Sequence, residues 1–187
     1  MLLILSAYLL GSIPFGVLVG RHTGIDPRQG GSRNIGATNV ARLMGWKWGL
    51  LVLALDIGKG ISAVCLVQTD NVNLMSMAAF AAALGHCYSI FLRGKGGKGV
   101  ATALGVMCMI DLTAAALATF VWVALSVFFR IAALSSLFAT ATMVLVVQLN
   151  QESFEVRILA VSLFCLITIR HTANLKQLKR RWFGKGV

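Results

Sequence analysis

Apolar runs long enough to cross a lipid bilayer recur along this sequence, and they limit how the chain can fold more than any other feature. They lie at roughly 1–20, 48–67, 74–92, 131–149 and 156–169. A membrane-spanning helix needs about 20 mostly apolar residues. Only 12% of the 187 residues are charged, whereas soluble domains average about 25%. The sequence therefore predicts an all-α protein that crosses the membrane several times.

The strong positive charge is explained most simply by this membrane setting. The formal net charge of +11 is also found in nucleic-acid-binding proteins, but Lys and Arg collect on the cytoplasmic loops of membrane proteins. We therefore expect no nucleic acid partner. The four cysteines lie inside apolar runs without CxxC spacing, as is typical of small buried residues. The sequence implies no metal and no cofactor.

The distribution of charge predicts the orientation of the chain. Basic residues gather in the segments 21–47, 93–98 and 170–185, whereas the segments 68–73 and 150–155 carry acids without Lys or Arg. Because basic segments stay on the cytoplasmic side, we expect the first three inside and the other two outside. The N-terminus is then outside and the C-terminus is cytoplasmic.

Residues 99–129 pose the main question of topology. The segment follows one basic loop and ends at Arg130, so both its ends should be cytoplasmic. We expect two short spans that turn at Asp111, which gives about seven membrane helices in total. Five helices and a re-entrant hairpin are the alternative. We expect one integral-membrane domain over residues 1–187.

Polar residues gather in three places on the predicted cytoplasmic side, and the first is residues 24–45, GIDPRQGGSRNIGATNVARLMG. Gly30 and Gly31 permit the close approach of a ligand. From Ile35 the pattern predicts an interfacial helix with Asn34 or Ser32 as its N-cap. The free N–H groups of such a helix would attract an anion. The alternative is an ordinary amphipathic loop at the membrane surface.

The second place is the segment LRGKGGKGVATALG at 92–105. Its glycines match GxGxxG, but no strand precedes them and no acidic residue follows at the distance needed to bind a ribose, so the match is weak. Successive glycine N–H groups can still form an anion-binding concavity, and lysine adds a positive charge. We predict a phosphate site. The alternative is a flexible loop whose lysines only orient the chain.

The third place is RHTANLKQLKRR at 170–181, where the last apolar run ends. His171 and Asn174 are three residues apart and should share one helix face. The basic residues that follow suit acidic lipid headgroups.

Three ionisable residues fall within the apolar runs. Asp56 and Lys59 are three residues apart and are expected to neutralise each other in the membrane, with a direct role in function as the less favoured alternative. For His86, a satisfied buried side chain and a substrate contact are equally plausible.

Four segments together resemble a known family. GSIPFG (11–16), GSRNIGATNVAR (31–42), GHCYSIFL with GKGGKGVAT (85–102), and RHTANLKQL (170–178) are similar, in this order, to signature segments of the bacterial membrane acyl-phosphate:glycerol-3-phosphate acyltransferases, the PlsY family. The resemblance implies an enzyme of the bacterial inner membrane with its active site facing the cytoplasm. It would transfer a fatty acyl group from acyl-phosphate to the 1-hydroxyl of sn-glycerol 3-phosphate, as the first acylation of phospholipid biosynthesis.

Under this resemblance the products are lysophosphatidic acid and phosphate, and no obligatory protein partner is identified. The hydroxyl would attack directly, without an acyl-enzyme, and the donor's phosphate or, less favoured, His171 would accept the proton. The residues expected to be catalytic are Ser32, Arg42, Lys98, His171 and Asn174. Those expected to bind substrate or phosphate are Asn34, Thr38, Asn39, Gly96, Gly97 and Lys95.

Two positions depart from the family pattern. Relatives usually read GSGN where this chain has GSRN, so Arg33 replaces a glycine, and Gly94 replaces the aromatic residue of FKGGKG. Neither departure removes a presumed functional side chain, so both bear on the backbone path of the loops.

Two other classes of function compete with the enzyme. A transporter or channel for a small anion would use the same basic pocket, but the predicted outer loops are short and acidic. A structural or assembly protein would not need Ser, Asn, His and Gly to gather on one side.

Overall fold

A computed structural model of the chain describes residues 1–67 and 71–183, and within them all regular secondary structure is helical. The helices are α1 (Leu2–Ser12), α2 (Phe15–Thr23), α3 (Ala37–Met44), α4 (Trp46–Cys65), α5 (Val72–Cys87), the 3₁₀-helix η1 (Ile90–Leu92), α6 (Val100–Ile110), α7 (Leu112–Phe129), α8 (Ala132–Leu149) and α9 (Phe154–Phe183). In this part of the chain six helical segments are long and apolar enough to span a membrane, and α6 is a shorter apolar helix. The predicted all-α polytopic fold is confirmed.

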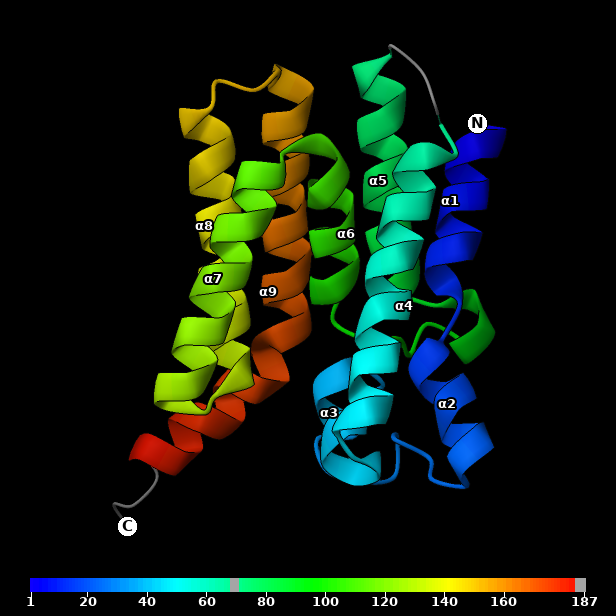
Figure 1. Cartoon of the computed structure of the whole chain (residues 1–187), viewed down its shortest axis with the longest axis vertical. Helices are drawn as coiled ribbons and strands as arrows, with labels where there is room; N and C mark the ends of the chain where they lie inside the picture. Colours follow the sequence, from blue (N-terminus) through cyan, green and yellow to red (C-terminus); the bar gives the residue numbers. More distant parts are fainter. Residues whose placement is uncertain (68–70, 184–187) are drawn as a thin grey trace.

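The chain runs up and down, so that the N-terminus and the end of α9 lie at opposite ends of the molecule (Figure 1). The loops before α3 and before α6, the turn between α7 and α8, and the end of α9 lie together at the end opposite the N-terminus. We call this the basic end, defined by residues 24–45, 93–99 and 170–180. The described parts of the three predicted basic segments thus share one end, as expected, while residues 184–185 of the third lie outside the described residues. Part of the predicted outer segment, residues 68–70, lies outside the described residues.

Residues 99–129 form two helices that turn at Asp111. The Oδ1 atom of Asp111 accepts the N–H of Ala114 at 2.9 Å and caps α7, while Oδ2 accepts the amide of Asn150 at 2.9 Å. At about 1.5 Å per residue the 18 residues of α7 are long enough to span the membrane, whereas the 11 residues of α6 are not.

The first apolar run is broken at Pro14 into α1 and α2. Proline has no N–H and disfavours helical geometry in the residue before it, and Ile13 accordingly has an extended conformation with ψ 118°. The break leaves two carbonyl groups without helical partners. The carbonyl of Ser12 accepts the hydroxyl of Ser89 at 2.6 Å, and that of Ile13 accepts the ammonium of Lys59 at 3.1 Å. The break therefore connects the first span to α4 and to the segment after α5.

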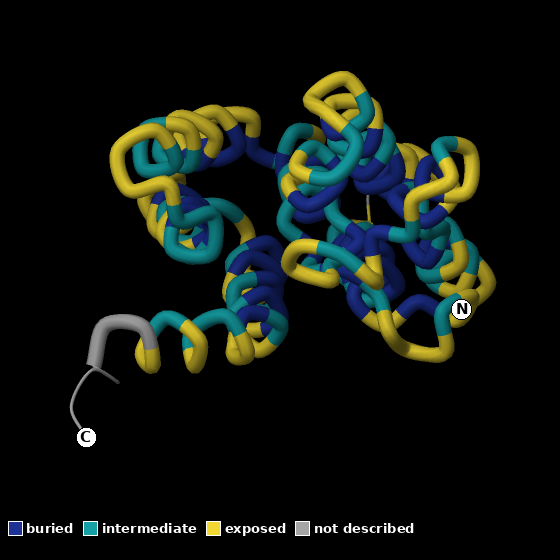
Figure 2. Tube along the Cα trace, turned by 90° about the horizontal axis from the view of Figure 1, so that it is seen from below, coloured by how far each residue is buried: buried dark blue, intermediate teal, exposed yellow. Residues whose placement is uncertain are grey.

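Helix α5 lies among the other helices and packs on them closely. Gly11 on α1 faces the backbone of Ala82, and Gly85 faces the backbone of Tyr8, so neither glycine has space for a Cβ atom. Small residues of this kind let membrane helices approach one another. Figure 2, viewed from the basic end, shows buried residues on the inward faces and exposed ones outside. Several exposed residues on α7 and α8 are large and apolar, among them Phe120, Phe128 and Phe138, which suits contact with lipid.

Candidate active site

The loop between α2 and α3 is organised by one buried side chain, Asn39. Its Oδ1 atom accepts the N–H of Ser32 at 2.9 Å and the guanidinium of Arg42 at 3.3 Å. Its Nδ2 donates to three carbonyls, those of Pro27, Gly30 and Asn34. The side chain of Asn39 is thus committed to the loop, and both of its N–H donors are already used. This leaves it no free donor for a phosphate.

The other polar residues of this loop lie closer to solvent. Ser32 and Thr38 are exposed, whereas Asn34 is half-buried. The predicted N-cap of the interfacial helix is wrong, because α3 begins after Gly36. The Oδ1 atom of Asn34 instead accepts the N–H of Gly36 at 2.8 Å, the local turn that asparagine favours.

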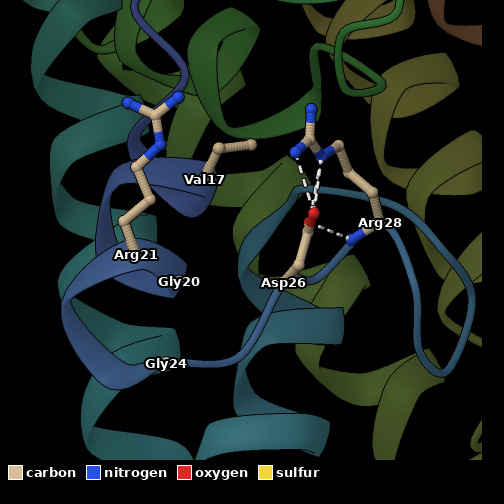
Figure 3. A pocket seen from close by; sticks show the side chains of 6 residues that line it. All are labelled: Val17, Gly20, Arg21, Gly24, Asp26 and Arg28. Carbon is tan, nitrogen blue, oxygen red and sulfur yellow. Dashed lines mark hydrogen bonds and ion pairs between the residues drawn. The ribbon is translucent and has the colours of Figure 1, made fainter.

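A pocket of about 200 Å³ lies beside the start of this loop (Figure 3) and is lined by Val17, Gly20, Arg21, Gly24, Asp26 and Arg28. Asp26 and Arg28 point toward each other, with 2.8 Å between Oδ2 and Nη2. Hydrogen bonds from the side chain and backbone of Arg28 lower the pKa of Asp26 to about 2. None of the predicted site residues lines this pocket, and the ion pair uses two of its three charged residues, Asp26 and Arg28, but not Arg21.

The loop at 93–99, the glycine loop, is held between α5 and α9. The N–H groups of Gly96 and Gly97 donate to the carbonyls of Cys87 and His86, at 3.2 and 2.9 Å. Their own carbonyls accept the guanidinium of Arg170, each at 3.0 Å. The predicted concavity of glycine N–H groups is therefore not formed by these two residues, because both N–H groups already have protein partners.

Glycine is required at these two positions for a different reason. A Cβ atom on Gly96 would collide with the carbonyls of His86 and Cys87, and one on Gly97 would collide with the His86 imidazole. The donors that remain for an anion here include the Lys98 ammonium and the first N–H groups of α6, which have no partner within the helix.

Arg170 is a site residue that the sequence did not reveal. Besides holding the glycine loop, its guanidinium lies 4.9 Å from the centre of the Tyr88 ring, within reach of a cation–π interaction. From the sequence, Arg170 was used only to predict the orientation of the chain, as one of the basic residues at the end of the last span. Its place at the start of RHTANLKQL, beside the predicted His171, was the one signal that pointed to it.

The structure brings together residues predicted from three separate segments. Lys98 is half-buried, and burial followed by the positive charges of Arg170 and Arg42 lowers its pKa from 10.5 to about 8. The charge of Lys98 in turn acts on His171. Cations from α3, the glycine loop and α9 therefore lie within electrostatic reach of one another.

His171 is buried on α9 and has a defined orientation. Its Nδ1 atom lies 2.8 Å from the carbonyl of Ile167, one turn earlier. Because a carbonyl only accepts, Nδ1 carries the proton and Nε2 is left as the free acceptor of the neutral ring. Asn174, one turn later, is half-buried, whereas Lys95 of the glycine loop is exposed.

These features define a class of protein: a polytopic helical membrane protein with an anion-attracting polar site at one end. Convergent Arg and Lys side chains are typical of sites that recognise phosphate. The site lies at the ends of helices whose outer faces suit lipid.

Comparison with known proteins identifies the family. The family model described as glycerol-3-phosphate acyltransferase matches residues 1–181. The glycerol-3-phosphate acyltransferase of Myxococcus xanthus is 45% identical over 183 residues, covering 96% of this chain and 95% of the relative. That of Aquifex aeolicus is 38% identical over 179 residues, covering 94% and 93%. The chain belongs to the glycerol-3-phosphate acyltransferase (PlsY) family.

Solved structures agree with this assignment. The crystal structure of PlsY, an integral membrane glycerol 3-phosphate acyltransferase, in its glycerol 3-phosphate form is similar to this chain with a TM-score of 0.91 and 37% identity. The match covers 95% of this chain and 90% of the solved chain. The lysophosphatidic acid form of the same enzyme gives a TM-score of 0.89 with the same coverage.

Proposed function

We propose that this chain, acting as a single domain over residues 1–187, uses acyl-phosphate as its acyl donor. The 1-hydroxyl oxygen of sn-glycerol 3-phosphate attacks the acyl carbonyl carbon, and a new ester bond forms. The bond between that carbon and the bridging phosphate oxygen then breaks. The products are lysophosphatidic acid and inorganic phosphate, and the hydroxyl proton leaves on the phosphate.

The observation that carries this proposal is the gathering of Arg42, Lys98 and Arg170 at one end of the molecule. Among the charges that act on Lys98 in the described part of the chain, only these two arginines are prominent. Two phosphate-bearing substrates bring several negative charges to one place. A cluster of cations offsets that charge and stabilises the negative charge that develops in the transition state.

Each residue takes a role that suits its place. Lys98 and the start of α6 hold the donor phosphate, while Arg42, Ser32 and Asn174 orient glycerol 3-phosphate, with Thr38 and Lys95 at the periphery. The planar fork of Arg42 suits a phosphate. Much of the rate enhancement then comes from orientation, an effect that reaches about 7–11 kcal/mol in favourable cases.

The proton has two candidate acceptors. The leaving phosphate is the first, because it is adjacent to the reacting hydroxyl and needs no protein base. The second is Nε2 of His171, which the bond from Nδ1 to Ile167 leaves available. Direct transfer needs neither a cofactor nor a covalent acyl-enzyme on Ser32.

We place the site on the cytoplasmic side of the bacterial inner membrane. The support is the positive-inside rule, since the basic end carries the basic segments at 21–47 and 93–98. Both substrates would then be reached from the cytoplasm, and no protein partner is required.

The deciding experiment is reconstitution of the purified protein with glycerol 3-phosphate and one of three donors: palmitoyl-phosphate, palmitoyl-CoA or palmitoyl-carrier protein. We expect lysophosphatidate and phosphate from the acyl-phosphate alone. Product from either thioester would overturn the choice of donor while leaving the family intact. A radiolabelled acyl chain found covalently on the protein would overturn direct transfer.

A further inference from the structure

We propose that Asp56, Lys59 and His86, the buried charge cluster, act as positioning residues. They fix the position of the glycine loop relative to the loop between α2 and α3. The cluster lies on α4 and α5 and, among the predicted site residues, contacts Gly97. It holds Lys98 opposite Arg42 by fixing the backbone on either side of the site.

The cluster is charged and almost fully buried. The Lys59 ammonium lies 2.9 Å from Oδ1 of Asp56, and the two side chains are only 2% and 3% exposed. Charges inside a membrane protein are expensive and mark function more often than stability. An apolar pair of the same size would fill this space at lower cost, so the charges need a reason.

On one side the cluster supports the glycine loop. The Nδ1 atom of His86 lies 3.5 Å from the same Oδ1 atom of Asp56, an electrostatic contact without hydrogen-bond geometry, and the carboxylate faces that edge of the ring. The opposite nitrogen, Nε2, lies directly against Gly97. The carbonyl of His86 also accepts the N–H of Gly97 at 2.9 Å. Asp56 therefore orients the ring on which the residue before Lys98 rests.

On the other side the cluster supports the break between α1 and α2. The ammonium of Lys59 donates to the carbonyl of Ile13 at 3.1 Å and lies 5.8 Å from the centre of the Phe15 ring. Phe15 is the first residue of α2, which leads into the loop that carries Ser32. Lys59 thus fixes the start of the helix on which that loop depends.

These contacts form one connected path between the two loops, from Ile13 through Lys59, Asp56 and His86 to Gly97. A methylene chain in place of Lys59 would leave the carbonyl of Ile13 without this donor, and an apolar residue in place of Asp56 would leave the imidazole free to turn. The charged groups therefore fix the orientation of their partners, which apolar packing does not.

The test begins with the double variant Asp56→Asn/Lys59→Met, which removes both charges and so leaves neither one buried without a partner. His86→Gln and the triple variant complete the set. Asp111→Asn makes the same Asp change at the opposite end of the molecule and is the matched control. Amide hydrogen exchange of residues 93–99 is measured by mass spectrometry, with residues 129–132 at the α7–α8 turn as the internal reference.

We expect exchange at 93–99 to be at least about tenfold faster in the double variant and in His86→Gln, with no change at the reference or in Asp111→Asn. The triple variant should be no faster than either, because all three residues act along one path. Unchanged exchange at 93–99 would overturn the proposal. So would equal acceleration at the reference, or a triple variant that shows the product of the two effects.

Kinetics supply a second readout, which rests on the proposed function, whereas the exchange measurement does not. In the double variant the kcat/KM for glycerol 3-phosphate should fall at least about tenfold while the melting temperature stays that of Asp111→Asn. Full activity with a rigid loop would overturn the link between loop register and catalysis. The absence of activity with acyl-phosphate in the wild type would count against the donor and not against the positioning residues.

Discussion

At the scale of single residues, Lys98 shows how the surroundings set the chemistry of a side chain. It would be an ordinary cation in an exposed loop, but burial and two neighbouring arginines bring its pKa to about 8. Its charge is therefore sensitive to pH in a range where an exposed lysine is fully protonated.

This sensitivity predicts an alkaline limit to substrate capture. Lysine is charged below its pKa, so the kcat/KM for glycerol 3-phosphate should be level below a pH of about 8 and fall above it, since this parameter reports the free enzyme. Arg42→Gln removes a positive charge that lowers the pKa of Lys98, and it should move the limit to higher pH even though overall activity is low.

The pH profile of Arg93→Gln is the control. Arg93 is exposed in the same loop and is not among the charges that act on Lys98, so its removal should leave the limit in place. An identical shift in both variants would mean that net charge, not the neighbourhood of Lys98, sets the profile.

Arg33 is a second residue whose setting has a measurable consequence. It has a φ of +56°, in the left-handed region, which costs a residue with a Cβ about 1–2 kcal/mol. A glycine at this position would avoid that cost. Arg33→Gly should therefore raise the free energy of unfolding by about 1 kcal/mol and retain activity, as measured by chemical denaturation in detergent. Arg33→Ala removes the same charge but keeps the Cβ, so a similar gain there would refute the backbone explanation.

At the scale of elements, the sequence predicted what periodicity and composition determine. The long apolar runs and the turn at Asp111 were confirmed because each depends on residues close together in the chain. The break at Pro14 was missed. The run from 1 to 20 is apolar throughout, and its hydropathy does not reveal that proline lacks the N–H group that a continuous helix needs. The carbonyls that it exposes acquire partners from Lys59 and Ser89, which only the tertiary fold brings near.

The interior of the two loops was predicted less well for the same reason. Gly96 and Gly97 were expected to offer N–H groups to a ligand, but those groups face carbonyls of α5. Asn39 was expected among the substrate contacts, yet its amide is fully used within its own loop. Residue types show that a segment binds polar groups, but they do not show whether those groups belong to a ligand or to the protein.

The loop between α2 and α3 should depend strongly on Asn39. Asn39→Ala leaves several polar groups of the loop without partners, so it should lower the free energy of unfolding by about 2–4 kcal/mol. Activity should fall at least about tenfold, because Ser32 and Arg42 both bond to its Oδ1 atom. Denaturation and steady-state kinetics measure the two effects.

Asn34→Ala is the comparison for that prediction. It removes a single hydrogen bond, to the N–H of Gly36, and should cost only about 1 kcal/mol. Equal losses in the free energy of unfolding in the two variants would show that Asn39 does not organise the loop.

At the scale of the whole molecule, the arrangement of charge follows the arrangement of helices. All residues expected to act in catalysis lie at the basic end, and the N-terminus lies at the other (Figure 1). The sequence predicted this division from charge alone, since the loops alternate between the two ends with each span. We propose the direction of the molecule in the membrane from the same rule.

Labelling of single cysteines tests that direction. In a chain whose native cysteines are replaced, Lys95→Cys at the basic end should react with a membrane-impermeant maleimide only from the cytoplasmic side. Gln151→Cys, in the turn between α8 and α9, should react only from the outside. Both positions are exposed, and the opposite pattern would invert the proposed orientation.

The hydrogen bonds from Arg170 to the glycine loop also determine when that loop can assemble during synthesis of the chain. The two carbonyls that Arg170 binds lie 73 and 74 residues earlier in the chain. A ribosome must therefore complete nearly the whole polypeptide, and α9 must enter the bilayer, before Gly96 and Gly97 gain two of their four hydrogen bonds. A chain that ends before α9 carries Ser32 and Lys98 but lacks both bonds, so we expect it to have no activity until the synthesis of α9 is complete.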